Sequence, residues 1–434
     1  MQPRGKSYHS RGTDDKTHLR GTGGSSLCCP CGRMRSLGFA IRKTENIVAE
    51  PGLLHYNIAA DFMTDHSLQD TVSWKHHASK RNLPVCSIFH FGNGDYEKTN
   101  QIVVALPCDC NRQRASFHYT TRFFEVTEID GKFPFAFPYG GEFGVGLLFI
   151  VTSFLSVFTT EKETSGLHYF LKRLARLWPV YAVCIVITAT VTWLFYPPLS
   201  PSLLRFLVNF TMLQKLAGFS GVDGAYWTLS YQLLFYAVIA VVIGLKKKDK
   251  LPLIAVVWTA ICIPLSALKW AGIDHSLLKL IRMGMISDYF SYFAIGILAS
   301  FLYREHTKET IRLSVVGAAL CLINQFFSQS IAGLIMLLIE IGLMLLISCK
   351  LELPGWLDHK VLYFFSDISY PLYLLHQYIG YVILHRLWNM GMTSAFVILV
   401  PFAVITILSA VLHRFVELPA SRLTARYLKP RKQA

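Results

Sequence analysis

The sequence predicts an all-α protein, a polytopic integral membrane bundle of about nine spanning helices that follows a poorly ordered amino-terminal extension. Two observations predict it. Apolar residues make up 53% of the 434 positions and charged residues only 16%, whereas roughly a quarter of an average globular chain is charged. Beyond residue 140, apolar runs of spanning length follow one another almost without interruption. This composition excludes a disordered chain, a disulfide scaffold and an ordinary cytosolic enzyme.

About nine apolar stretches after residue 140 are long enough to cross a bilayer, and we expect each to be helical, because lipid offers no partner for free backbone amides. The shorter apolar string at 202–213 is interpreted as interfacial or re-entrant. The stretches lie at 143–158, 174–196, 226–245, 251–270, 284–303, 312–328, 331–349, 361–385 and 394–413.

Three segments follow from this pattern. Residues 1–140 contain no run approaching the roughly 18 apolar residues of a spanning helix, and no secretory signal is recognisable. We expect this extension to be irregular or weakly folded. Residues 141–425 form the predicted transmembrane domain, and residues 426–434 a basic tail.

The net charge of +15 is distributed as in a membrane protein. Lys and Arg gather in the loops at 172–176, 246–250 and 304–312 and in the region after residue 413, while the intervening loops are poorer in them. Under the positive-inside rule this places the carboxyl terminus in the cytoplasm. We therefore predict a multi-pass protein of the plasma, or bacterial inner, membrane, and no nucleic-acid partner.

The cysteines and histidines of the extension do not have zinc-site spacing. Tetrahedral zinc sites use ligand pairs two to four residues apart, whereas these cysteines are adjacent or one residue apart and about 80 residues from their potential partners. We expect no bound metal. The residues concerned are Cys28, Cys29, Cys31, His76, His77, Cys108 and Cys110.

Arg173 and Arg176 lie three residues apart in FLKRLARLWPVY and would share one helix face at the cytoplasmic membrane surface. Two guanidinium groups fixed there can bind the phosphates of a nucleotide-like cofactor. The alternative is a topogenic anchor whose arginines extend to the lipid headgroups.

The string FSDISYPLYLLHQYIGYVILH brings polar groups into an apolar stretch. Ser369, Tyr373 and His376 follow at spacings of four and three residues, so they would line one helix face. Burying an ionisable group in a membrane costs about 2–3 kcal/mol even on lenient scales, which makes such a group a functional hypothesis. The alternative is a hydrogen-bonded histidine that bridges helices.

Gln232 and Glu340 are two further polar residues inside apolar stretches, and each needs a partner there. Gln232 lies in GAYWTLSYQLLFY, whose aromatic residues also suit an interfacial belt. Glu340 lies in LIMLLIEIGLML.

Taken in order, these strings resemble the acyltransferase-3 family of polytopic membrane O-acyltransferases. The resemblance covers about residues 140–425 and rests on a glycine-led string from Gly144, the arginine pair, Trp227–Tyr236, ISYPLYLLH ending at His376, and a closing Glu417-x-Pro419. Family members are similar in having about ten helices and in moving acyl groups, usually acetyl, from acyl-CoA to hydroxyls of cell-surface sugars, peptidoglycan or lipids.

The resemblance implies roles for individual residues. Arg173 and Arg176 would bind acyl-CoA, and the catalytic cavity would be lined by His376, Ser369, Tyr373 and Gln232. The family's presumed base is a histidine in the first membrane helix, about eleven residues after an arginine. In this sequence His90, which follows Arg81, comes nearest to that pattern.

The sequence departs from the family pattern at three further places. Gly146 stands where the family usually has aspartate, Thr152-Ser153 where it has Ser-Gly, and Gln232 where it has glutamate. About nine spans instead of ten is what the loss of the first helix would leave. We therefore expect the family fold with an unrelated extension, 1–140, and an activity impaired by the missing first helix.

The expected function is transfer of an acyl group, with acetyl the expected one, from acyl-CoA to a hydroxyl of a cell-envelope carbohydrate or a lipid-linked acceptor. The alternative is a non-catalytic transporter or channel-like bundle in which His376, Glu340 and Gln232 line a solute path. Transporters are often built from internal repeats, and the sequence has no convincing repeat.

Overall fold

The protein is an all-helical bundle. Its structure, a computed structural model, describes residues 111, 114–135, 140–161, 163–328, 331–350 and 359–428. These residues contain no strand, and each of the nine apolar stretches predicted from the sequence is mainly helical within them. The predicted all-α membrane bundle is therefore confirmed.

Seven helical segments among the described residues are long and apolar enough to cross a membrane. They are α4 (Gly140–Thr160), α5 (Gly166–Phe195), α7 (Trp227–Gly244), Lys248–Trp270 with α8 (Leu251–Trp270), α11 (Lys308–Ser328), α12 (Ile331–Ser348), and Ala395–Tyr427 with α16 (Leu399–Leu412) and α17 (Leu418–Tyr427). The protein is thus a multi-pass integral membrane protein. The string interpreted as interfacial forms the short helix α6 (Leu203–Asn209).

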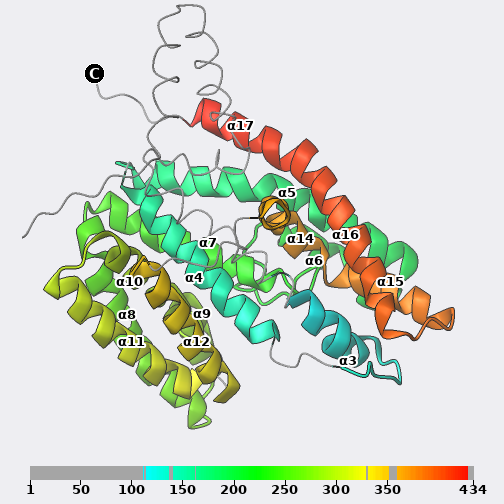
Figure 1. Cartoon of the computed structure of the whole chain (residues 1–434), viewed down its shortest axis with the longest axis horizontal. Coiled ribbons are helices and arrows are strands. Elements are labelled where there is room, and N and C mark those ends of the chain that lie inside the picture. The colour runs from blue at the N-terminus through cyan, green and yellow to red at the C-terminus, as the bar shows by residue number, and fades with distance from the viewer. Residues whose placement is uncertain are drawn as a thin grey trace, which may run out of the picture. The chain divides into compact units, whose positions relative to one another are not determined.

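Helix α10 (Phe290–Arg304) is only 15 residues long and is buried over most of its length. It packs against α4, α8, α11 and α12, which Figure 1 shows gathered together. Gly296 brings α10 against α4, because a Cβ atom there would overlap the Ser153 side chain and the Ile150 carbonyl oxygen. Small residues permit this kind of close helix contact inside membranes.

The stretch predicted as one span at 361–385 is a broken helix. It consists of α13 (Lys360–Asp367), α14 (Ser369–Leu375) and α15 (Tyr378–Asn389). Helix α14 packs against α5 and α16, and α15 also contacts both, so the break lies within the protein. An interrupted backbone at membrane depth is tolerated only where protein or a water-filled cavity surrounds it.

Residues 114–127, which precede α4, are helical as well. Residues 114–117 lead into η2 (His118–Arg122), a π-helical turn, and then into α3 (Phe123–Thr127). Both elements contact α15, and Tyr119 and Phe123 are buried there. Most of the predicted extension, including His90 and the cysteines discussed above, lies outside the described residues.

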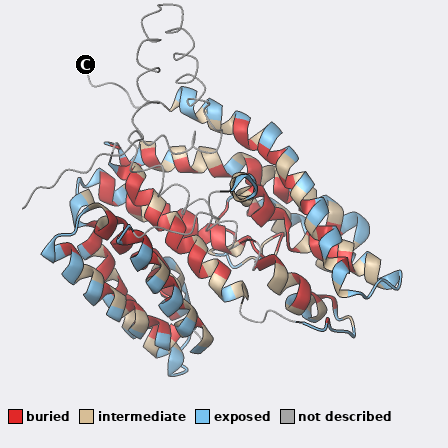
Figure 2. Cartoon of the chain, viewed as in Figure 1, coloured by how far each residue is buried: buried red, intermediate tan, exposed pale blue. Residues whose placement is uncertain are grey.

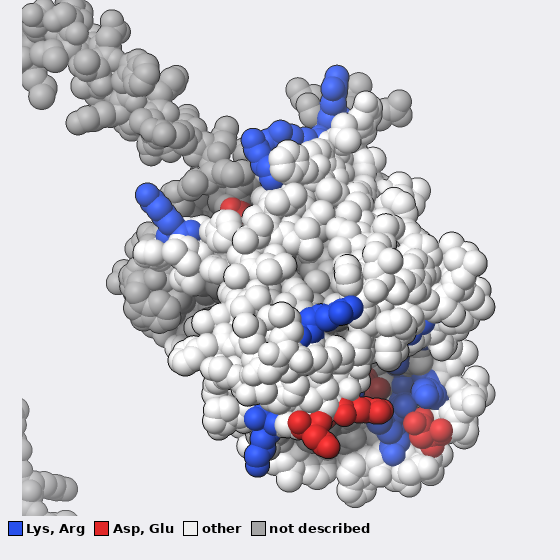
Figure 3. All heavy atoms as spheres, turned by 90° about the vertical axis from the view of Figure 1, so that its right-hand side faces the viewer, with Lys and Arg blue, Asp and Glu red and all other residues white. Residues whose placement is uncertain are grey.

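The outer surface of the bundle suits a lipid environment. In Figure 2 buried residues lie where helices face one another, and exposed ones lie on the outward faces. Large apolar side chains such as Leu194, Val315 and Ile339 are exposed. One face of the molecule carries a broad, mainly uncharged band, with basic or acidic groups concentrated above and below it (Figure 3).

The contact at Gly296 predicts that Gly296→Val destabilises the protein, because the new side chain would force α10 away from α4. Overpacking of this kind costs roughly 1–3 kcal/mol. Thermal unfolding of the purified protein in detergent measures the effect. Gly342→Val is the matched control, since open space surrounds a Cβ atom at that position. Equal melting temperatures for the two variants would contradict the close packing.

Candidate active site

A cavity of about 460 Å3 opens where the first turns of α4 and α7 meet η2 and the broken helix. Its volume is in the range of small-molecule sites. Side chains from five separate parts of the chain form its walls, with Tyr373 the one predicted site residue among them. The lining residues are Arg114, Phe117, His118, Arg122, Val126, Gly141, Glu142, Val145, Gly224, Ala225, Trp227, Thr228, Tyr289, Tyr292, Tyr373, Gln377 and Tyr378.

His118 supplies an imidazole to the cavity wall from the π-helical turn η2. Its Nδ1 atom is hydrogen-bonded to the hydroxyl of Tyr381, 3.0 Å away on α15. Burial lowers the pKa of His118 well below its usual range, and the neighbouring His376 and Arg114 lower it further. The imidazole is therefore neutral at neutral pH, with one nitrogen held and the other available to a ligand.

His376 lies directly behind His118, with 5.1 Å between the ring centroids. Its Nδ1–H donates a hydrogen bond to the backbone carbonyl of Tyr373, 2.7 Å away, which fixes the tautomer because a carbonyl can only accept. The Nε2 atom is buried without a hydrogen-bond partner among the described residues. His376 is not among the residues that line the cavity.

Tyr373 connects three parts of the cavity wall. Its hydroxyl donates to the carbonyl oxygen of Ala225 at 2.6 Å and also contacts the hydroxyl of Thr228. The guanidinium carbon of Arg114 lies 4.5 Å from the centre of the Tyr373 ring. The ring therefore serves as a platform between α7 and the helix that carries His118.

Asp223 joins the loop before α7 to the break between α14 and α15. One carboxylate oxygen accepts a hydrogen bond from the amide of Ala225 at 2.9 Å, and the other accepts one from the amide of Tyr378 at 2.8 Å. Tyr378 begins α15, so the carboxylate of Asp223 caps a helix that is 155 residues away in sequence. Burial raises the pKa of Asp223 to about 7.

Helix η2 is fastened to the same break. The hydroxyl of Tyr119 donates to the backbone carbonyl of His376 at 2.6 Å. The Tyr119 ring occupies the space that a side chain at Gly380 would need. These two contacts hold η2 against the break, so that the rings of His118 and His376 lie next to each other.

Gln232 and Arg173 meet at a different place, around Tyr236. The Gln232 amide donates to the hydroxyl of Thr152 at 2.8 Å and to that of Tyr236 at 3.2 Å. The guanidinium carbon of Arg173 lies 5.4 Å from the Tyr236 ring centre and 5.4 Å from that of Tyr169, and Arg173 also donates to the Thr159 hydroxyl. Neither Gln232 nor Arg173 lines the cavity described above.

Comparison with known proteins identifies the fold's family. The family profile described as "Acyltransferase domain" (Acyl_transf_3) matches residues 115–414, which is more than half of the chain and includes His118. The chain belongs to the acyltransferase-3 family. This finding confirms the resemblance inferred from the sequence motifs.

A curated relative agrees with this membership. The acyltransferase is 25% identical over 262 residues to "Exopolysaccharide production protein ExoZ" of Rhizobium meliloti (strain 1021). The match covers 55% of the chain and 76% of that relative. No solved structure matches the chain significantly.

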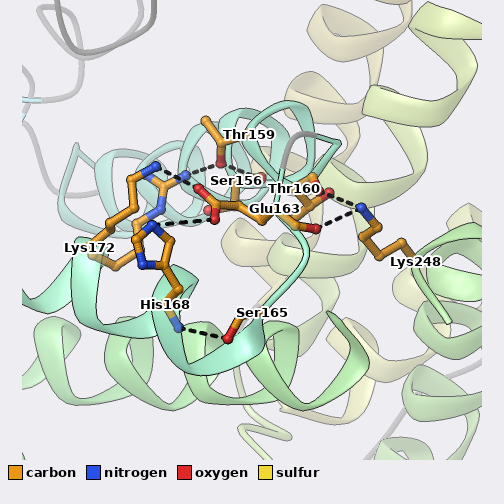
Figure 4. Close-up of polar contacts among 9 residues, drawn as sticks. Ser156, Thr159, Thr160, Glu163, Ser165, His168, Lys172 and Lys248 are labelled. Atoms are coloured by element: carbon orange, nitrogen blue, oxygen red, sulfur yellow. Dashed lines mark hydrogen bonds and ion pairs between the residues drawn. The ribbon is translucent and has the colours of Figure 1, made fainter. Parts of the chain in front are cut away.

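Polar contacts hold together the turn between α4 and α5 of the acyltransferase (Figure 4). Glu163 forms an ion pair with Lys172 at 2.6 Å and lies 3.9 Å from the His168 ring. The ammonium group of Lys248 donates to the carbonyl oxygens of Thr160 and Glu163, at 2.9 Å each. This Lys residue satisfies carbonyls that the end of α4 leaves free.

The predicted site residues of the acyltransferase thus fall into two groups. Tyr373 and His376 lie together, 5.7 Å apart between ring centroids, next to the cavity. Ser369 begins α14, and its backbone carbonyl accepts a hydrogen bond from Asn111 at 2.8 Å. Gln232 lies with Arg173 near Tyr236, which is at the middle of α7 and farther along the helix than the cavity. Neither Arg173 nor Arg176 lines the cavity.

Glu340 is buried on α12 and lies against Gly146 of α4. An ideal Cβ atom on Gly146 would be 2.5 Å from a Glu340 carboxylate oxygen and 2.5 Å from the Tyr292 ring. The Leu147 amide is near the carboxylate, but no described group forms a full hydrogen bond with either oxygen. A carboxylate from another helix thus occupies the position at which the sequence lacks the family's aspartate.

The sequence analysis missed His118 and Arg114. They lie four residues apart in RASFHYTTRFF and share a helix face, which is the one available sign of a site there. The stretch contains too few consecutive apolar residues to stand out as a membrane helix. His118 is recognisable only through its contact with His376 and Tyr381, residues more than 250 positions away.

The cap formed by Asp223 predicts that Asp223→Ala destabilises the acyltransferase by about 2–4 kcal/mol, because two buried amides lose their acceptor. Asp223→Asn, which keeps one acceptor oxygen, should show a smaller loss. Chemical unfolding in detergent micelles measures both values. The assignment fails if the alanine variant is as stable as the wild type.

Proposed function

We propose that this membrane acyltransferase transfers an acyl group, most simply acetyl, from acyl-CoA to a hydroxyl of a cell-envelope carbohydrate. The observation that carries the proposal is the half-buried, neutral imidazole of His118 at the wall of the cavity, with Nδ1 hydrogen-bonded to Tyr381. A neutral imidazole with one nitrogen fixed can act as a general base at the other.

The chemistry follows from this arrangement. Nδ1–H of His118 would donate to the oxygen of Tyr381, leaving the lone pair on Nε2. That nitrogen removes the proton of the acceptor hydroxyl as its oxygen attacks the thioester carbonyl carbon. The tetrahedral intermediate collapses with cleavage of the carbon–sulfur bond, and the imidazolium returns the proton to the departing thiolate. An ester and free CoA thiol result.

His376 packs against the ring of His118 and limits its movement. Its tautomer is fixed by the Tyr373 carbonyl, and its ring lies 5.1 Å from that of His118. We propose that His376 is a positioning residue and that Tyr373 forms one wall of the cavity. Ser369 and Gln232 remain predicted site residues, although neither lines this cavity. His90, the base suggested by sequence spacing, lies outside the described residues.

A carbohydrate acceptor suits the walls of the cavity. Trp227, Tyr289, Tyr292 and Tyr378 offer flat apolar rings, three of them with a hydroxyl at the tip, while Gln377 offers an amide. Such surfaces bind a ligand that combines apolar ring faces with hydroxyl groups. The relative named for exopolysaccharide production is consistent with an extracellular polysaccharide as the acceptor.

The donor would bind farther along α7 than the cavity, near the middle of the helix. Arg173 lies near Tyr236, about 12 Å along the helix from Thr228 at the cavity. We propose that Arg173 and Arg176 bind the CoA phosphates at the cytoplasmic surface and that the thioester arm follows α7, past Gln232, toward His118. The carboxyl terminus would then be cytoplasmic, in a plasma or bacterial inner membrane.

His118→Asn should lower kcat for acyl transfer by roughly a hundredfold to ten-thousandfold, because the general base is lost. Transfer of labelled acetyl from acetyl-CoA to membrane-derived acceptors measures it. His306→Ala, an exposed position after α10, is the control and should retain full activity. Wild-type transfer by His118→Asn would remove His118 from the mechanism. Solute flux in liposomes without any transfer would favour the transporter alternative.

The lowered pKa of His118 predicts the pH dependence of the reaction. A base must be unprotonated to act, so a pKa below the usual 6.5 extends the active range toward acid. We expect kcat/KM to stay level from pH 7.5 down to 6.5 and to fall only below that. Measurement with pH-matched controls of folding tests this. A decline with an apparent pKa at or above 6.5 would contradict the assignment if it persists in Asp223→Asn, which removes the Asp223 carboxyl and its pKa of about 7.

A further inference from the structure

Arg114 places a guanidinium group inside the cavity without a matching anion. Its side chain lines the cavity, yet the residue is only 3% exposed. The Nε and Nη2 atoms have no hydrogen-bond partner among the described residues. The guanidinium carbon lies 4.5 Å from the centre of the Tyr373 ring, and the guanidinium group also interacts with the hydroxyl of that residue.

Such a group is costly to bury. Arginine cannot escape the cost by losing its proton, and a ring face compensates only part of the lost hydration. Nearly all buried donors in folded proteins are hydrogen-bonded. Two adjacent N–H groups with no acceptor in the described part of the chain therefore indicate that a ligand supplies the acceptor.

The charges around Arg114 do not provide that acceptor. Arg122, a second guanidinium at the cavity, is paired with Glu125. Glu142 lies on the α4 wall, and the described residues contain no ion pair between Arg114 and an acidic side chain. The imidazoles of His118 and His376 bring no negative charge.

The geometry of the two N–H groups of Arg114 indicates the class of ligand. Nε and Nη2 lie on one edge of the guanidinium fork and match two oxygens of one carboxylate or phosphate group. Arg114 and His118 are one helical turn apart, which places their Cβ atoms about 5–6 Å from each other. A single sugar unit can present an anionic group and a hydroxyl at such a separation.

We propose that Arg114 is the specificity residue of the acceptor site and that the acceptor is an anionic sugar, whose carboxylate or phosphate binds Arg114 while a hydroxyl meets His118. The inference rests on the proposed function for the role of that hydroxyl. The anion site itself depends only on Arg114 and the cavity.

Equilibrium dialysis of the purified full-length protein in detergent tests the site without catalysis. The probes are labelled glucuronate, glucose 6-phosphate and glucose. We expect at least one anionic sugar to bind 10-fold or more tightly than glucose, as charge-assisted hydrogen bonds imply. The carboxylate and phosphate arms show which anion the site takes.

Variants assign the preference to Arg114. Arg114→Gln should abolish it, and Arg114→Lys, which keeps the charge but lacks the fork, should reduce it. Arg386→Gln, at an exposed arginine of α15 away from the cavity, should retain it. Thermal unfolding with each sugar provides a second reading, because a bound ligand raises the melting temperature.

The outcomes separate the two proposals. Glucose binding to the wild type as tightly as both anionic sugars overturns the anion site, whether or not any variant folds. Retention of the preference in Arg114→Gln overturns it as well. His118→Asn should keep the preference and lose acyl transfer. Wild-type transfer by that variant, with the preference intact, would overturn the proposed function and leave the anion site standing.

Discussion

The arrangement of the site depends on one constraint, the need to satisfy the backbone amides where a helix breaks inside the bundle. Between α14 and α15 the amide of Tyr378 has no partner within its own helix, and the carboxylate of Asp223 supplies one. In a soluble protein water could do this, but an apolar environment offers nothing else. The break is stable because a distant loop carries the acceptor.

Several features of the cavity follow from this cap. The loop around Asp223 brings Gly224 against the side chain of Gln377, so closely that a Cβ atom on Gly224 would overlap the amide. On the other side of the break, Tyr119 binds the carbonyl of His376. The segment around η2 supplies the imidazole of His118 and the guanidinium group of Arg114, and the break supplies the amide of Gln377, so groups far apart in sequence line one cavity.

Much of the fold could be predicted from the sequence, because membrane helices are recorded in the length of their apolar runs. The nine predicted stretches are helical, and the strings around Arg173 and Tyr373 indicated the family correctly. What the sequence could not show is the break at His376 and Gln377, because the apolar residues on both sides of these two polar positions are continuous enough to be interpreted as one span. Hydropathy does not distinguish one span from two half-helices.

The site was predictable only where its residues share one element. Tyr373 and His376 are three positions apart, and their contact follows from helix geometry. The proposed roles of His118 and Glu340 depend on contacts with residues far away in sequence, which the sequence alone does not reveal. Gly146 looked like a lost carboxylate, whereas the structure places the carboxylate of Glu340 against that glycine. That a carboxylate on one helix lies where another helix lacks one depends on how the helices pack, and a single sequence does not show helix packing.

The central claim is that the cavity beside His118 is where acyl group and acceptor meet. A structure of the protein in lipid nanodiscs, with a non-transferable thioether analogue of acetyl-CoA and a bound sugar, tests it most directly. The account predicts a sugar hydroxyl within hydrogen-bond distance of the His118 Nε2 atom and the acyl end of the analogue beside it. Both ligands bound elsewhere, with His118 facing packed side chains, would contradict it.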